Sequence, residues 1–172
     1  MTKGCVHILT GDGKGKTTAA IGLALIAVSS GLKVFFAQFV KKGEYSEINA
    51  FRRLGDQITV EQFGLARFTD TESNPEDILA AQNGLSRVRT IMAENRYDMM
   101  VLDEITLAIK FGLIAENDLM ELIVNKSHSL ELIITGRYAS PRVIEIADMV
   151  TEMKALKHYY QKGVKARVGI DK

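Results

Sequence analysis

Nine consecutive residues near the start of the chain, TGDGKGKTT at positions 10–18, have the composition of a phosphate-binding loop. The candidate nucleotide-binding residues are Gly11, Asp12, Gly13, Lys14, Gly15, Lys16, Thr17 and Thr18. The three glycines can take backbone conformations closed to residues with a Cβ, so that successive N–H groups turn toward an anion. Lys16 would supply an ammonium to the phosphates, and Thr17 a hydroxyl to the Mg²⁺ that accompanies them. The chemistry that this loop predicts is the binding of the phosphates of a nucleotide.

The context of the loop supports this interpretation. Apolar residues 6–9 precede it like a buried strand, and the apolar stretch 19–28 follows it like a helix, as a Walker A motif requires. The usual pattern G-x-x-x-x-G-K-[ST] needs glycine where this chain has Thr10, so the loop is a shorter variant that starts at Gly11. The alternative is a flexible glycine-rich turn before a helix. We favour the P-loop because GKTT after a strand is far more restrictive than isolated glycines.

A second chemical signal is the hydrophobic run 99–102 followed by Asp103 and Glu104. Two carboxylates at the carboxyl end of a strand form a Walker B pattern. We expect this strand to lie beside the P-loop strand, which would bring both carboxylates to Thr17 and the metal. An acidic pair after a strand can also cap a helix, but the P-loop upstream favours nucleotide binding.

Three further residues are candidates with two interpretations each. Gln38 interrupts the apolar run 33–40 and is either hydrogen-bonded in the core, which we favour, or directed at a ligand. Phe68 lies in a loop and either anchors local packing or faces a large flat ligand. Arg137 follows the apolar run 130–135 and either holds a phosphate or braces a loop.

The whole chain limits the class of protein. With 172 residues, net charge +1 and 47% hydrophobic residues, it fits one domain, residues 1–172, and gives no global sign of a nucleic-acid partner. Cys5 is the single cysteine, so an internal disulfide and a multi-cysteine zinc site are excluded. We find no leader pattern and no apolar segment long enough to span a membrane, and expect a soluble cytoplasmic protein. Residues 154–172 form a basic tail, which we expect to be mostly solvated.

Strand-like and helix-like patterns alternate along the chain. Strands are expected at 6–9, 33–40, 58–63, 99–104, 130–135 and 149–153, and helices at 17–30, 46–54, 75–95, 105–111, 116–126 and 141–147. Ser46 is the expected cap of the second helix. This alternation predicts one α/β domain, a mostly parallel sheet flanked by helices.

Several segments match, in order, the motifs of a known family. They are residues 11–20, 38–41, 101–104, 134–137, and in the tail 163–166 and 169–171. On these segments the chain resembles the P-loop ATP:corrinoid (cobalamin) adenosyltransferases over nearly its full length. The combination of GDGKGKTT, ITGR and a terminal GVKA and GID is not a general NTPase signature.

The resemblance implies an enzyme that transfers the 5′-deoxyadenosyl group of ATP to the Co(I) of a corrinoid and releases triphosphate, in coenzyme B12 biosynthesis or salvage. It implies a single RecA-like P-loop domain, a homodimer, and a P-loop that holds ATP in reversed polarity, so that C5′ is open to cobalt. By position match Lys16, Thr17 and Glu104 are catalytic, and Thr17, Asp103 and Glu104 hold Mg²⁺. Which of the two carboxylates contacts the metal directly stays open. The implied partners are ATP, a reduced corrinoid and, as a candidate electron donor, a flavoprotein reductase.

One segment departs from the family pattern. Related proteins can carry Phe-Thr-Trp in the loop after the third strand, where aromatic residues are associated with displacing the lower axial ligand of cobalt. The corresponding stretch here is RFTD at 67–70, and the chain has no tryptophan. We expect Phe68 to keep part of this role.

Two other classes of function compete with the transferase. A P-loop kinase would move the γ-phosphoryl group and produce ADP, and a regulatory or assembly ATPase would hold or hydrolyse ATP without a corrinoid. The products separate them, because only the adenosyltransferase makes triphosphate and an organocobalt bond.

Overall fold

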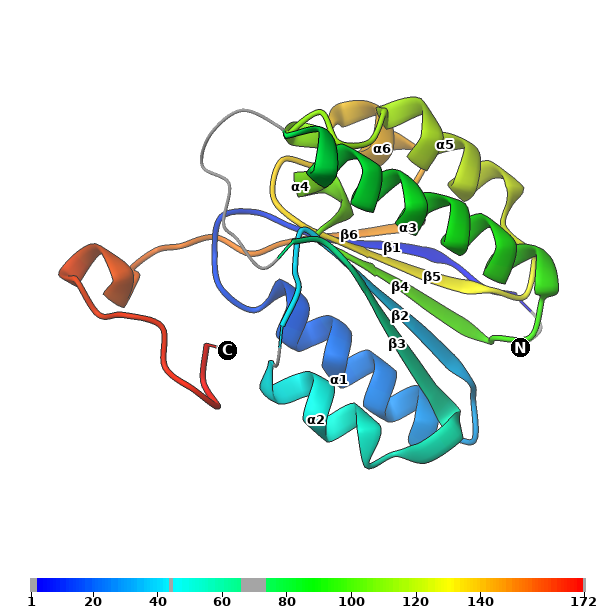
Figure 1. The fold of residues 1–172 in the computed structure, drawn as a ribbon, viewed down its shortest axis with the longest axis horizontal. Coiled ribbons are helices and arrows are strands. Elements are labelled where there is room, and N and C mark those ends of the chain that lie inside the picture. The colour runs from blue at the N-terminus through cyan, green and yellow to red at the C-terminus, as the bar shows by residue number, and fades with distance from the viewer. Residues whose placement is uncertain (1–2, 44, 66–73, 172) are drawn as a thin grey trace.

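A six-stranded parallel sheet forms the centre of the molecule (Figure 1). The computed structural model describes residues 3–43, 45–65 and 74–171. The strands are β1 (Val6–Thr10), β2 (Val34–Phe39), β3 (Ile58–Phe63), β4 (Met99–Asp103), β5 (Glu131–Thr135) and β6 (Met149–Glu152). Their order across the sheet is β3-β2-β4-β5-β1-β6. The expected α/β class with a parallel sheet is confirmed.

Helices cover both faces of the sheet. They are α1 (Lys16–Ser29), α2 (Ser46–Arg52), α3 (Pro75–Glu94), α4 (Ile105–Lys110), α5 (Glu116–Asn125) and α6 (Pro141–Glu145), with short 3₁₀ turns at Gly55–Gln57 and Tyr159–Lys162. Figure 1 shows α1 and α2 on one face and the other four helices on the opposite face. Within the described ranges, no helix is long and apolar enough to cross a lipid bilayer.

The inner strands are apolar almost without interruption because both of their faces are covered. Neighbouring residues of a strand point to opposite faces, so Phe35 and Phe36 enter different cores. The Phe35 ring lies 5.5 Å from that of Tyr97, and the Phe36 ring 5.2 Å from that of Phe51 in α2. Burial of each such side chain stabilises the fold by about 1.5–3 kcal/mol. These two cores fix the sheet between its helix layers.

The two edge strands differ from the inner ones. Among the described residues β3 pairs only with β2, and it is half-buried along most of its length, which explains the alternating pattern of its sequence. β6 pairs with β1 at the other edge, and its four residues are exposed.

The expected adjacency of the P-loop strand and the acidic strand is wrong. β5 lies between β1 and β4, so the two motifs are one strand apart. All three strands carry similar continuous apolar runs, which fit any central position, so the local pattern did not determine their order. The carboxyl ends nevertheless share one edge of the sheet because every strand is parallel.

The expected cap of α2 is also wrong. Tyr45, in extended conformation, holds the cap position, and Ser46 is the first helical residue. By contrast, α3 begins as expected with Pro75 in its first turn, and the side chain of Asn74 accepts a hydrogen bond from the Glu76 N–H at 2.9 Å.

Candidate active site

The loop that joins β1 to α1 lies at the carboxyl edge of the sheet. Gly15 holds the cap position of α1 with φ 123°, which favours glycine, and it brings no side chain to the helix terminus. The first N–H groups of α1 lack carbonyl partners within the helix and, together with its dipole, favour a bound anion. Thr17 and the exposed Thr18 lie in this first turn.

Lys16 lies inside the loop rather than extending into solvent. Its side chain folds back so that Nζ donates to the carbonyl oxygens of Gly11 at 2.7 Å and Gly13 at 2.8 Å. The residue is buried, and this burial lowers the pKa of the ammonium from its ordinary value, although the carboxylate of Glu104 acts in the opposite direction. The ammonium therefore lies within the loop where a phosphate would bind.

Packing against the chain after β6 requires two glycines of the loop. A Cβ on Gly11 would lie 2.4 Å from the carbonyl oxygen of Met153, and one on Gly13 would lie 2.7 Å from the same atom. The Gly13 N–H donates to that oxygen at 2.7 Å. The sequence predicts that successive N–H groups of the loop face the anion. The Gly13 N–H instead donates to Met153, the residue after β6.

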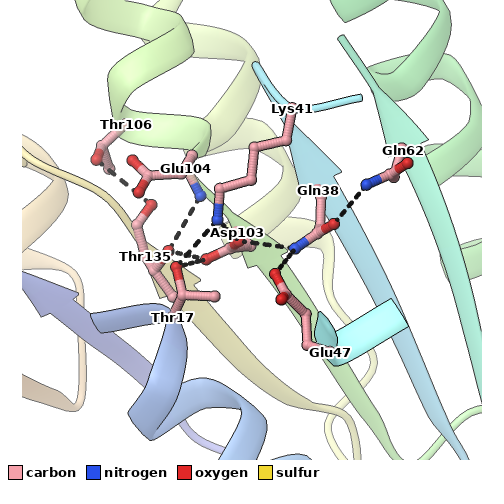
Figure 2. Close-up of polar contacts among 9 residues, drawn as sticks. All are labelled: Thr17, Gln38, Lys41, Glu47, Gln62, Asp103, Glu104, Thr106 and Thr135. Atoms are coloured by element: carbon pink, nitrogen blue, oxygen red, sulfur yellow. Dashed lines mark hydrogen bonds and ion pairs between the residues drawn. The ribbon is translucent and has the colours of Figure 1, made fainter. Parts of the chain in front are cut away.

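Asp103 is the centre of a buried hydrogen-bond network (Figure 2). The hydroxyls of Thr17 and Thr135 donate to Oδ1 at 2.8 and 2.6 Å. Lys41 Nζ and Gln38 Nε2 donate to Oδ2 at 2.9 and 3.3 Å. Four donors, from α1, from β5 and from β2 with the residues that follow it, therefore hold this carboxylate in place.

Gln38 has the contacts of a core residue. It is fully buried, and Nε2 also donates to Glu47 Oε1 at 3.3 Å, while Oε1 accepts from Gln62 Nε2 at 2.9 Å (Figure 2). These bonds support the favoured interpretation, in which Gln38 is a hydrogen-bonded amide in the core. Direct contact of Gln38 with a ligand stays a prediction.

Glu104 is held in an unusual backbone conformation at the start of α4. Its φ is 60°, a left-handed region that costs a non-glycine residue about 1–2 kcal/mol, and its N–H donates to Thr135 Oγ1 at 3.0 Å. Burial, and then the nearby charge of Asp103, raise the pKa of the Glu104 carboxyl above its ordinary value. Its Oε2 is buried and has no hydrogen-bond partner among the described residues.

These oxygens fit a magnesium ion that arrives with a nucleotide. No group of three or more His, Cys, Asp or Glu side chains in the described part of the chain could hold a metal by itself. Mg²⁺ commonly takes one or two carboxylates and completes its shell with phosphate oxygens and water. The unpartnered Oε2 of Glu104, the adjacent residue Asp103 and the Thr17 hydroxyl that binds Asp103 would supply such a partial set.

Arg137 borders the P-loop from the end of β5. Its side chain is exposed and lines a hollow of about 500 Å³ together with Gly11, Asp12 and Tyr138. Burial is the main cause that lowers the pKa of Lys16, and the positive charge of Arg137 acts in the same direction, while it partly offsets the burial that raises the pKa of Glu104. Both expected roles, holding a phosphate and bracing the loop, remain open.

The Lys14 side chain binds the C-terminal tail and not the interior of the loop. Its Nζ donates to the Tyr159 hydroxyl at 2.8 Å and to the Ile170 carbonyl at 2.7 Å, and it pairs with Asp171. Arg167 also pairs with Asp171, at 3.1 Å, and these partners hold the pKa of the Asp171 carboxyl far below its usual range. Most tail residues are exposed, as expected, but the attachment at Lys14 was not anticipated.

Sequence reasoning missed two residues of the Asp103 network. Lys41 is a polar residue just after the buried strand β2, and polar character near the end of this strand was the signal that singled out Gln38. Thr135 is the last residue of the buried strand β5. Phe68 lies outside the described residues, so its expected role stays a prediction.

Comparison with known proteins places this site in a family. Residues 2–171 match the family model "ATP:corrinoid adenosyltransferase BtuR/CobO/CobP". The chain is 36% identical over 171 residues to a corrinoid adenosyltransferase of Escherichia coli K12, covering 98% of this chain and 86% of that protein. A corrinoid adenosyltransferase of Pseudomonas aeruginosa PAO1 is 31% identical, with 98% and 84% covered.

A solved structure supports the fold. A KaiC-like protein of Pyrococcus horikoshii OT3 superposes with a TM-score of 0.59 at 18% identity, over 88% of this chain and 73% of that one. At this identity the likeness concerns the fold alone. The match over almost the whole chain, with a P-loop and an acidic pair at one sheet edge, leads to one conclusion: the chain belongs to the ATP:corrinoid adenosyltransferase family.

Proposed function

We propose that this site transfers the 5′-deoxyadenosyl group of ATP to the Co(I) of a corrinoid. The cobalt electron pair forms the Co–C5′ bond, the C5′–O bond breaks, and triphosphate leaves with that bond's electrons. Because Co(I) is itself a strong nucleophile, the protein needs no nucleophilic side chain. The proposal rests on one observation: the P-loop lysine and the unpartnered oxygen of Glu104 lie at the same edge of the sheet. The chain that carries them matches the family from residue 2 to residue 171.

The first task of the site is to stabilise charge on the departing triphosphate. Lys16 and the N–H groups at the start of α1 would bind its oxygens, which gain negative charge as the C5′–O bond breaks. Arg137, exposed at the margin of the loop, adds positive charge on the same side. The second task is to hold C5′ in line with cobalt, and a rigid loop at the sheet edge suits it.

We propose that Mg²⁺ binds at Thr17, Asp103 and Glu104, and that Glu104 is its principal carboxylate ligand. All four hydrogen bonds to Asp103 come from side chains that fix it, whereas Glu104 Oε2 has no described partner. Thr17 would add its hydroxyl, as P-loop Ser and Thr residues do. The bound ion would supply positive charge to the triphosphate oxygens.

An anaerobic assay tests this function. Purified protein is mixed with Mg²⁺, ATP and cob(I)alamin, the visible spectrum is followed, and nucleotide products are analysed in parallel. A light-sensitive alkylcobalt product with equimolar triphosphate supports the transferase. ADP without an organocobalt product would support a kinase or ATPase, which the family match does not favour.

The variant Lys16→Ala tests the role of the loop. Loss of a charge-assisted contact where charge develops should lower the rate by about 10²–10³-fold, or about 3–4 kcal/mol. Lys33→Ala, an exposed lysine beside the first residue of β2, is the matched control. Wild-type rates in Lys16→Ala would remove the P-loop from the mechanism.

We further propose a homodimeric, cytoplasmic enzyme that folds as one domain, residues 1–172, and accepts electrons from a flavoprotein reductase. Exposed apolar side chains along β6, Met149 at 51% and Val150 at 37%, supply a surface that a dimer would cover. A mass measurement by light scattering tests the dimer, and coincident unfolding transitions from two probes test the single domain.

A further inference from the structure

Lys41 approaches the buried carboxylates from the end of β2. The strand ends at Phe39, and Val40 follows with φ 59°, a rare conformation for a β-branched residue. After this turn the Lys41 side chain runs back toward the end of β4, as Figure 2 shows. It is 20% exposed, while the Asp103 side chain that it meets is fully buried.

The ammonium of Lys41 binds two of the oxygens assigned to the metal. Nζ lies 2.9 Å from Asp103 Oδ2 and 3.3 Å from Thr17 Oγ1. The ammonium therefore lies between a buried carboxylate and the P-loop threonine, in a position that another cation would otherwise take.

A divalent ion and this ammonium cannot share these oxygens. Two cations about 3 Å apart repel strongly, and more so in a partly buried site than in water. An ion bound between Thr17 and the carboxylates must therefore displace Lys41. The displaced group stays tethered at the sheet edge, where the oxygens of a triphosphate would offer it a new partner.

Resting on the proposed function, we propose that Lys41 is a positioning residue that competes with Mg²⁺ for Thr17 and Asp103, so that the metal binds well only with its triphosphate. A free metal ion must displace the ammonium without compensation. When the metal arrives with triphosphate, the phosphate oxygens can bind the displaced ammonium of Lys41. Lys41 also balances the charge of buried Asp103 when no metal is bound.

The test measures Mn²⁺ binding by electron paramagnetic resonance, with and without inorganic tripolyphosphate. Without tripolyphosphate, Lys41→Met should bind Mn²⁺ about tenfold tighter than wild type or more, because an ammonium that occupies the oxygens most of the time reduces apparent affinity by at least that factor. With tripolyphosphate this advantage should shrink or reverse. Mn²⁺ should also raise the melting temperature of Lys41→Met more than that of wild type.

Lys42→Met is the matched control, since it removes an exposed charge from the next residue. If it tightens Mn²⁺ binding as much as Lys41→Met, a general electrostatic effect explains the result and the proposal fails. Equal Mn²⁺ affinity of wild type and Lys41→Met without tripolyphosphate also overturns it. If Lys41→Met does not fold, Lys41→Gln is measured in the same way and must show the same gain.

The proposed metal site can fail separately. Wild-type protein that binds no Mn²⁺ even with tripolyphosphate or ATP would refute the assignment of the metal to Thr17, Asp103 and Glu104. Wild-type protein that binds Mn²⁺ with tripolyphosphate, while Lys41→Met shows no gain without it, would leave that assignment intact and refute only the role of Lys41.

Discussion

Replacing Thr135 by valine should disturb the positions of the Asp103 and Glu104 carboxylates without removing either group. The Thr135 hydroxyl donates to Asp103 Oδ1 at 2.6 Å and accepts from the Glu104 N–H at 3.0 Å, and the residue is fully buried. Valine has nearly the same shape but makes neither bond. Both acidic residues would then lose a partner, while their own side chains remain.

The expected cost follows from these two bonds. A hydrogen bond to a charged group contributes about 1.5–3 kcal/mol, and a buried N–H left without an acceptor costs about 1–3 kcal/mol. Asp103 Oδ1 keeps its bond from Thr17 at 2.8 Å, so the two costs do not add fully. We expect a loss of about 3 kcal/mol in the free energy of unfolding, or roughly 6–12 °C in melting temperature.

Urea unfolding and the anaerobic transfer assay together test this reasoning. Thr135→Val should lower the unfolding midpoint at an unchanged slope, and should lower the transfer rate because Glu104 is no longer held in its left-handed conformation. Thr135→Ser keeps the hydroxyl and is the matched control. If Thr135→Val equals wild type in both measurements, or Thr135→Ser loses as much as valine does, the hydroxyl does not position the carboxylates.

Two further substitutions test the strained segments beside the site. Because the pKa of Glu104 is raised above its ordinary 4.5, the unfolded chain releases this proton first, and the stability of the wild-type protein falls as pH rises above that value. Without metal, Glu104→Gln should therefore be more stable than wild type at about pH 8, by about 1.4 kcal/mol for each pH unit by which folding raises the pKa, and this gain should vanish near pH 4. A difference in urea unfolding that does not change with pH would contradict this. Gly136→Ala should cost about 2–4 kcal/mol, because φ is 137° and the new Cβ would lie 2.3 Å from Thr106 Oγ1. Gly112→Ala, at φ 68° with open space around it, is its control in thermal unfolding and should show the smaller cost of backbone strain alone.

The chemistry of the site was readable from local sequence. A lysine and a threonine after a glycine-rich loop, and two carboxylates after an apolar run, predicted the P-loop and acidic pair because backbone conformation and ligand type are properties of a few neighbouring residues. The apolar runs predicted a buried parallel sheet for the same reason, since strands covered on both faces have few polar residues.

The order of the strands required the tertiary structure. β5 separates the P-loop strand from the acidic strand, yet its sequence ELIIT resembles theirs in apolar character. Strand order depends on which helices and loops cross the sheet, and these contacts join residues far apart in the chain. The network around Asp103 depends on that order, because Thr135 reaches it from the inserted strand.

The partners of individual charges were likewise decided by the fold. The sequence determined that the chain carries a P-loop, an acidic pair and a basic tail. Only the tertiary structure decided that Lys14 binds the tail, that the Gly13 N–H donates to the chain after β6, and that the Lys41 ammonium pairs with Asp103. A charged side chain can pair with any opposite charge within a few ångströms, so its partner is fixed by the packing of distant segments and not by its neighbours in sequence.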